Sequence, residues 1–289
     1  MAYPAPDRLF DIRPTPSGYL GAFSTRPIAA GTLVLADSPL FTLDAPLQAY
    51  LFQRAQSGSG GGPTLPDGEE EQEPPKSLDE FLERQIRTML SWKTDEQRRQ
   101  FWELANTRED LPPAYGIFAT NAVQTKDETG GLFLFLSRFN SSCRPTLSRP
   151  AWDPSTATTR LYALRDIAAG EELTWTYLNV TFEFEGVDAR REEMRRVFEF
   201  ECGCPACAEE GMGGMGAEER GRSERRLLQL RRLKERVDWS EGADKKARGE
   251  LLRRMAGMAR EEGLWETAGR LEKSAAEGED TEEDSKAEE

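Results

Sequence analysis

Two short segments, RFNSSCRPTL at residues 138–147 and GEELTWTY at residues 170–177, decide how the rest of the chain is interpreted. The first carries Cys143, and the other three cysteines follow in ECGCPAC at residues 201–207. The second ends on Tyr177 and alternates apolar side chains with threonine, which is typical of a strand. These segments therefore contain a candidate cysteine site and a predicted strand that ends on a tyrosine.

The cysteines predict one structural zinc site. A C-x-C-x-x-C run can supply three thiolates from one tight loop, and tetrahedral zinc needs a fourth ligand at about 2.3 Å. Cys143 is the only cysteine left for that position, so the expected ligands are Cys143, Cys202, Cys204 and Cys207. Four protein ligands leave no open position for a substrate, which indicates a structural role. Unligated or disulfide-bonded thiols are the alternative.

The composition excludes several classes of function. The 289 residues contain no histidine, which rules out Ser-His-Asp catalysis, Cys-His catalysis and His-ligated zinc. The net charge of −14 is concentrated, because residues 276–289 carry −7 and five acids between positions 67 and 73 add −5, which leaves about −2 for the rest. A nearly neutral body lacks the clustered basic face that duplex nucleic acid requires, so no direct nucleic-acid groove is expected.

No membrane segment is expected from the sequence. The first ten residues, MAYPAPDRLF, lack the apolar core of a signal peptide, and the longest apolar run, LFLFL, is far short of about 18 residues. We expect an intracellular protein of the nucleus and/or cytoplasm, where a reducing environment favours metal binding over disulfides.

The apolar pattern predicts an α+β fold of short strands and helices. Strands are expected at 19–23, 32–36, 159–164 and 172–177. Helices are expected at 77–92, 95–105, 189–197 and, as two or three helices, 223–273. The Pro112-Pro113 pair is expected to end the first helical block. The Glu171-Glu172 pair follows a glycine and is expected in a solvated turn.

The ordered motifs point to a family. GYLGAFSTRPIAAGTLV at 18–34, RFNSSCRP at 138–145, GEELTWTY at 170–177 and FECGCPAC at 200–207 follow one another along the chain. In that order they resemble SET-domain protein lysine methyltransferases, most closely the fungal group related to the SET and MYND type. The resemblance covers roughly residues 8–208. A MYND finger is not expected, because no further cysteine or histidine is present.

The resemblance implies a split SET domain with a helical insert between its halves. The expected regions are the N-terminal half of the SET domain at 8–56, a flexible low-complexity insertion at 57–76, the helical insert at 77–112, the C-terminal half at 113–181, a post-SET zinc segment at 182–209, a C-terminal helical region at 223–275 and a disordered acidic tail at 276–289.

The resemblance also implies an activity, which is methyl transfer from S-adenosylmethionine to a lysine of a protein or peptide, with histones among the candidate substrates. Tyr177 matches the family's catalytic tyrosine. The residues that match the cofactor-binding positions are Gly18, Tyr19, Leu20, Asn140 and Ser141. Phe198 and Phe200 would wall the channel for the substrate lysine.

Several residues depart from the family's pattern. Ser141 replaces a histidine, Thr146 an asparagine and Tyr19 a glycine, and Phe198 stands where relatives often carry a second tyrosine. These departures define an alternative, which is a catalytically weakened or inactive SET-domain protein that acts as a binding module or adaptor. A helical adaptor working through residues 223–273 is compatible with either activity state.

Overall fold

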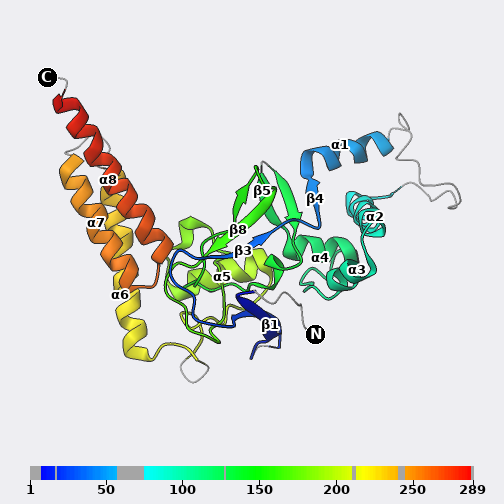
Figure 1. Ribbon diagram of the computed structural model, residues 1–289, viewed down its shortest axis with the longest axis horizontal. Coiled ribbons are helices and arrows are strands. Elements are labelled where there is room, and N and C mark those ends of the chain that lie inside the picture. Colours follow the sequence, from blue (N-terminus) through cyan, green and yellow to red (C-terminus); the bar gives the residue numbers. More distant parts are fainter. Residues whose placement is uncertain are drawn as a thin grey trace, which may run out of the picture.

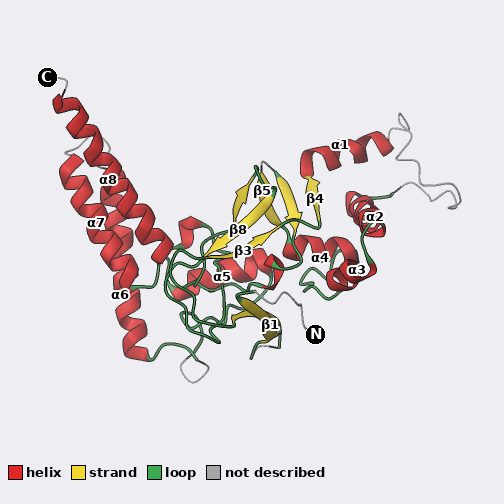
Figure 2. Ribbon diagram, in the orientation of Figure 1, coloured by secondary structure: helices red, strands yellow, loops and turns green. Residues whose placement is uncertain are grey.

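The fold is of the predicted α+β class, with short strands in the middle of the molecule and helices on both sides of them (Figures 1 and 2). The computed structural model describes residues 8–16, 18–56, 75–126, 128–209, 213–239 and 245–287. The predicted flexible insertion at 57–76 lies outside these residues except for its last two.

The described strands form small antiparallel sheets. β1 (Phe10–Pro14) pairs with β2 (Leu20–Ser24). β8 (Thr158–Tyr162) lies between β3 (Leu33–Asp37) and β7 (Ala151–Asp153). β6 (Thr129–Leu132) lies between β4 (Phe41–Asp44) and β5 (Val123–Lys126). Buried apolar side chains between these sheets, Phe139 and Leu161 among them, form the central core.

The segment at 172–177 is not the predicted strand. It is extended, but its backbone bonds to two different neighbours instead of to one partner strand. The Leu173 N–H donates to the Ala22 carbonyl of β2 at 2.8 Å, and the Trp175 N–H donates to the Asn140 carbonyl at 3.2 Å. Because the bonds change partner along the segment, only isolated bridges form. The segment thereby connects β2 to the loop that carries Asn140.

The helical insert is longer than predicted. It contains α1 (Ala45–Gln56), α2 (Leu78–Ser91), α3 (Asp95–Trp102) and α4 (Pro113–Asn121). The expectation that Pro112 and Pro113 close the block is wrong, because Pro113 occupies the first position of α4, where a missing N–H costs nothing. Ser77 and Thr94 cap α2 and α3 through their side chains.

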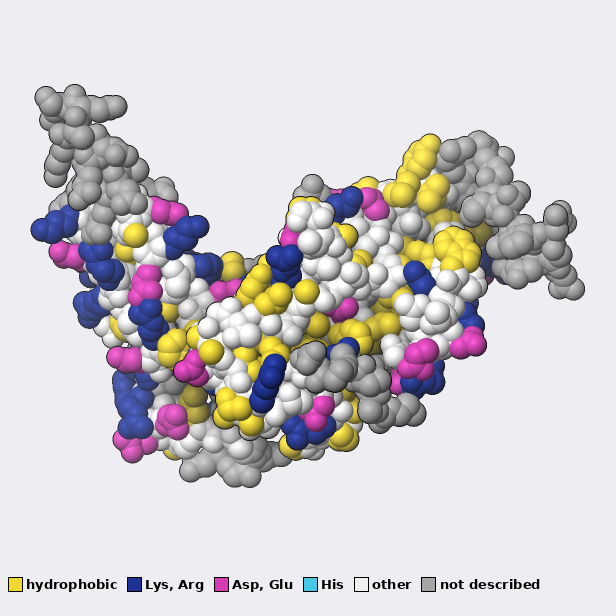
Figure 3. Space-filling model, viewed as in Figure 1, with side chains coloured by type: hydrophobic (Ala, Val, Ile, Leu, Met, Phe, Trp, Pro, Cys, Tyr) yellow, Lys and Arg dark blue, Asp and Glu magenta, His cyan; other side chains and the backbone are white. Residues whose placement is uncertain are grey.

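Apolar side chains are exposed on the insert. Leu47 and Tyr50 lie on α1, and Trp92 follows α2 with 76% of its surface exposed. Figure 3 shows apolar side chains gathered over α1. No described helix is long and apolar enough to cross a bilayer.

The C-terminal region forms three described helices on the side of the molecule opposite the insert (Figure 1). They are α6 (Ala217–Trp239), α7 (Lys245–Glu261) and α8 (Trp265–Ala287). Leucine and methionine side chains predicted to form their apolar stripe pack into a separate core. A disordered tail was predicted from residue 276, whereas α8 continues to Ala287. Its last twelve residues include four glutamates and two alanines, which are good helix formers. Residues 288 and 289 lie outside the described part.

The fold also contains two short helical turns and the helix α5. The turns are η1 (Leu136–Arg138), just before Asn140, and η2 (Val180–Phe182). The predicted helix at 189–197 is α5 (Val187–Phe198), which leads into the cysteine-rich segment.

Candidate active site and metal centre

A cavity of about 230 Å3 opens where the turn between β1 and β2 faces η1. Its lining consists of Gly18, Tyr19, Leu20, Glu103, Ala105, Ser137, Arg138 and Asn140. Four of the five residues expected to bind a cofactor are therefore brought to one cavity from two distant parts of the chain. The fifth, Ser141, is not among the lining residues.

Glycines give the β1–β2 hairpin its shape at this cavity. Gly18 has φ of +87°, a left-handed conformation that other residues rarely adopt. Tyr19 does not adopt that conformation, and it is 59% exposed at the cavity wall. A Cβ on Gly21 would lie 2.7 Å from a Glu172 carboxylate oxygen and 2.9 Å from Asn140 Nδ2, so only glycine allows this close approach.

Asn140 ties three segments together with one amide group. Its Nδ2 donates to the Leu20 carbonyl at 3.2 Å and to Glu172 Oε1 at 2.9 Å. The hairpin, the Asn140 loop and the segment after residue 170 are therefore fixed relative to one another. Glu172 was predicted to lie in a solvated turn, and this contact corrects that expectation.

Tyr177 is partly buried among aromatic rings, close to Asn140. Its hydroxyl donates to the Phe139 carbonyl at 3.0 Å, and its N–H donates to Ser141 Oγ at 3.2 Å. Burial, together with the charge of Glu172, raises the pKa of the Tyr177 phenol well above its usual value. The hydroxyl is therefore a neutral donor at physiological pH.

Phe198 and Phe200 pack around the same tyrosine. Their ring centroids lie 5.4 Å and 6.4 Å from that of Tyr177. Glu199, between them, adopts a left-handed conformation with φ of 59° that ends α5 and turns the chain back. The Thr107 hydroxyl of the helical insert donates to the Phe198 carbonyl at 3.3 Å. The three rings form an aromatic cluster, in which the Tyr177 hydroxyl is the polar group.

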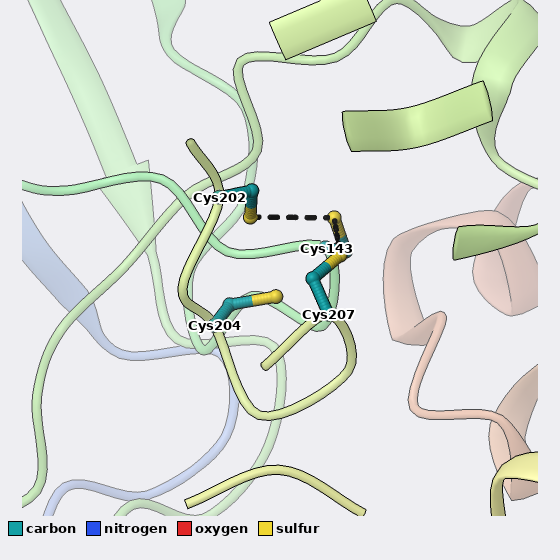
Figure 4. A group of neighbouring side chains, drawn as sticks. All are labelled: Cys143, Cys202, Cys204 and Cys207. Atoms are coloured by element: carbon teal, nitrogen blue, oxygen red, sulfur yellow. Dashed lines mark hydrogen bonds between the residues drawn. The ribbon is translucent and has the colours of Figure 1, made fainter. Parts of the chain in front are cut away.

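The four cysteines are buried together, although 59 to 64 residues separate Cys143 from Cys202 and Cys207. Their sulfur atoms all lie within 4.8 Å of one another (Figure 4). Cys143 Sγ is 3.9 Å from Cys202 Sγ and 3.5 Å from Cys207 Sγ. Tetrahedral zinc with bonds of about 2.3 Å places its sulfurs about 3.8 Å apart. The spacing and the chemistry of this donor set therefore fit a zinc ion.

A buried arginine lies beside the sulfurs. Arg190 of α5 is 1% exposed, and its Nη2 lies 3.3 Å from the Ala206 carbonyl and 3.9 Å from Cys207 Sγ. Four thiolates around Zn²⁺ carry a net charge of −2. A buried net charge of −2 is costly in a low-dielectric interior. The Arg190 guanidinium lies close enough to offset part of it.

Comparison with known proteins identifies the family. The SET domain model matches residues 19–178, more than half of the chain. The chain belongs to the SET domain family. The match contains Tyr19, Asn140 and Tyr177, and it ends before the cysteine-rich segment.

Individual relatives are similar over shorter stretches. Histone-lysine N-methyltransferase set5 of Schizosaccharomyces pombe is 34% identical over 128 residues, which is 44% of this chain and 39% of the relative. Human histone-lysine N-methyltransferase SMYD3 is 33% identical over 108 residues, 34% of this chain and 24% of the relative. The chain thus spans at most about two fifths of the length of these curated relatives. The solved structure of Rubisco LSMT bound to AdoMet covers 95% of this chain and 88% of its own at 12% identity and a TM-score of 0.36.

Within this SET domain, Arg138 is a residue that sequence reasoning missed. It lines the cavity, is 4% exposed, and donates from Nη1 to the Glu103 carbonyl at 3.0 Å. Its Nε and Nη2 are buried without a hydrogen-bond partner among the described residues. The sequence gives little warning of this, because most arginines are exposed and Arg138 stands in no charge cluster. Its signals are that it follows the apolar run LFLFL and lies two residues before Asn140.

Proposed function

We propose that this protein is an S-adenosylmethionine-dependent protein lysine N-methyltransferase. The observation that carries the proposal is the cavity shared by Asn140 and residues 18–20, inside the SET domain match. The Tyr177 hydroxyl bonds to the Phe139 carbonyl, next to Asn140. The similarity to proteins named histone-lysine N-methyltransferases supports the reaction type and a lysine-bearing protein substrate. Histones are the first substrates to test, in the nucleus and/or cytoplasm.

The cofactor would be held by the backbone at 18–20, by Asn140 and by the main chain of Ser141. When bound, S-adenosylmethionine supplies an activated sulfonium methyl group, so the reaction depends chiefly on alignment. Arg138 lines the cavity, and its buried Nε and Nη2 have no hydrogen-bond partner among the described residues. We propose that it binds the carboxylate of the cofactor, because a guanidinium and a carboxylate form strong charge-assisted hydrogen bonds.

The substrate lysine must lose its proton before it can accept a methyl group. An apolar channel favours the neutral amine, because desolvation lowers the pKa of a buried lysine. We propose that Phe198 and Phe200 wall this channel and that the Tyr177 hydroxyl orients the amine. The hydroxyl is suited to this role because its raised pKa keeps it protonated.

The four cysteines would hold a structural zinc ion. With four protein ligands the metal has no open position, so it would take no part in methyl transfer. We propose that it fixes the segment from 182 to 209, which carries both channel phenylalanines, against the loop that starts at Asn140.

Calorimetric titration with S-adenosylmethionine tests the cofactor assignment. Saturable binding near micromolar Kd, about −8 kcal/mol, is expected for the zinc-loaded protein. Arg138→Met should weaken binding by roughly 10- to 100-fold, because it removes hydrogen bonds to a charged group worth about 1.5–3 kcal/mol. Arg160→Met is the matched control, since Arg160 pairs with Asp153 at 2.7 Å and does not line the cavity.

Two outcomes would contradict this account. Equal affinities for the Arg138→Met variant and the wild type would exclude Arg138 as a cofactor ligand. No binding to the wild type, in a protein shown to be folded by its thermal transition, would favour the alternative of a SET-domain binding module in which Tyr19 and Ser141 have removed cofactor affinity.

A further inference from the structure

A buried ion pair connects the C-terminal helices to the loop that carries the first zinc ligand. Arg144, the residue after Cys143, donates from Nη2 to Glu262 Oε1. Glu262 lies in the turn between α7 and α8, and its side chain is 2% exposed. The Arg144 side chain is 12% exposed and also donates to the Cys143 carbonyl at 2.7 Å. The pair thus acts directly on the backbone next to Cys143.

The same carboxylate also binds α6. The Ser223 hydroxyl donates to Glu262 Oε1, and Arg226 Nε lies 3.5 Å from Oε2. Glu262 therefore joins the Arg144 loop, α6 and the α7–α8 turn through one buried group. Buried carboxylates are expensive unless they are paired, so each of these contacts matters for where the group sits.

The turn that presents Glu262 fits closely against Arg144. Gly263 has φ of +76°, and a Cβ at this position would lie 3.3 Å from Arg144 Cδ. A side chain here would be strained and would also crowd the arginine. The α7–α8 turn therefore packs closely against Arg144 in addition to forming the ion pair with it.

A second contact between the same two regions offers a comparison. The Arg149 N–H donates to Glu266 Oε1 of α8 at 3.0 Å, and Arg149 Nε lies 3.4 Å from Glu266 Oε2. Both side chains are 26% exposed. This contact lies five residues further along the chain from Arg144 and does not touch the Cys143 backbone.

We propose that the α7–α8 turn is a positioning element for the site, and that Glu262, through Arg144, fixes the backbone of residues 140–147. This segment begins at the cavity with Asn140 and contains Cys143. It also contacts the 172–177 segment, because the Ser142 N–H donates to the Trp175 carbonyl at 2.9 Å. The C-terminal helices then contribute to the site without touching substrate or cofactor. The part of this inference that concerns cofactor affinity rests on the proposed function; the part that concerns the loop does not.

Hydrogen exchange of the zinc-loaded full chain, followed by mass spectrometry, tests the proposal. The probes are the amides of Ser142, Thr146 and Leu147, which donate to backbone carbonyls at 2.9 to 3.1 Å. Glu262→Gln should speed their exchange at least about tenfold, because it removes the charge that holds Arg144. Glu266→Gln is the control and should change these rates by less than about twofold. Amides of β8 should be unchanged in both variants.

A second pair of measurements separates positioning from general stability. Arg144→Met leaves Glu262 bonded to α6, so it should fold even if Glu262→Gln does not, and it should speed exchange of the same amides. The Arg144→Met/Glu262→Gln double variant should be no worse than the worse single variant, because both changes break the same Arg144–Glu262 contact. Both single variants should also weaken S-adenosylmethionine binding several-fold and speed zinc transfer to a chromogenic chelator.

The outcomes distinguish the inference from the proposed function. Unchanged exchange at 142–147 in both single variants, or equal acceleration across the whole chain, would overturn the inference. If the wild type fails to bind S-adenosylmethionine but exchange rises locally, the positioning role stands and the proposed function fails. If the wild type binds S-adenosylmethionine and exchange is unchanged in both single variants, the proposed function stands and the positioning role fails.

Discussion

Tyr177→Phe is expected to lower the rate of methyl transfer at least about 100-fold, the scale of losing one preorganised hydrogen-bond donor at a reacting centre. The ring would still pack against Trp175, at a centroid distance of 4.6 Å, and against the two phenylalanines. The lost hydrogen bond to the Phe139 carbonyl is a neutral one, worth about 1 kcal/mol of folding free energy. Activity should therefore fall far more than stability.

Single-turnover transfer to a lysine substrate, with thermal unfolding measured alongside, provides the test. Tyr162→Phe in β8 is the matched control, because it removes a hydroxyl from a tyrosine outside the cavity and outside the aromatic group. The raised pKa of Tyr177 adds an expectation about pH: the wild-type rate should show no loss from ionisation of this phenol up to about pH 10, its unperturbed pKa. An unchanged rate in Tyr177→Phe would refute its catalytic role.

Removal of zinc is expected to have the largest effect on the fold. Structural zinc sites contribute about 10–16 kcal/mol of apparent binding free energy at neutral pH, which exceeds the stability of many domains. In this protein the ligands join segments about 60 residues apart, so the metal closes a long loop. Without it, Phe198 and Phe200 would lose the anchor that holds them beside Tyr177.

Metal analysis and thermal unfolding should show this directly. A strong chelator should lower the unfolding temperature by at least about 10 °C and release about one zinc per chain, and added zinc should restore both. Cys143→Ala should reproduce the loss, whereas Ser142→Ala, a change at the neighbouring buried residue, should keep the metal. A protein that stays fully folded and active after chelation would contradict a structural zinc.

The cysteine spacing and the family resemblance predicted part of the site. The cysteine cluster was predictable, because a C-x-C-x-x-C run lacks one ligand and only Cys143 could supply it; the sulfurs are indeed together. The position of Tyr177 beside Phe198 and Phe200 followed from the resemblance, and the rings do gather. Their roles stay predictions.

Other features depend on contacts that no local pattern encodes. Residues 172–177 have a strand's alternation, but their hydrogen bonds are shared between β2 and the Asn140 loop, so no strand forms. Pro113 indicates a break in the chain and is equally suited to begin a helix. Arg138 stands between the apolar run LFLFL and Phe139, whereas Glu262 follows Arg260 and Glu261, so neither setting in the sequence shows what the side chain contacts. Only the tertiary packing makes them buried, and charge patterns along the chain cannot predict this.

The measurement that tests the central claim most directly is mass spectrometry of protein substrates after incubation with zinc-loaded protein and methyl-labelled S-adenosylmethionine. Core histones and a mixture of denatured cell proteins would serve as substrates. The account predicts labelled methyl groups on lysine side chains of at least one protein, absent with Tyr177→Phe and after zinc removal. Saturable cofactor binding with no labelled lysine in either substrate set, or label that persists in Tyr177→Phe, would contradict it.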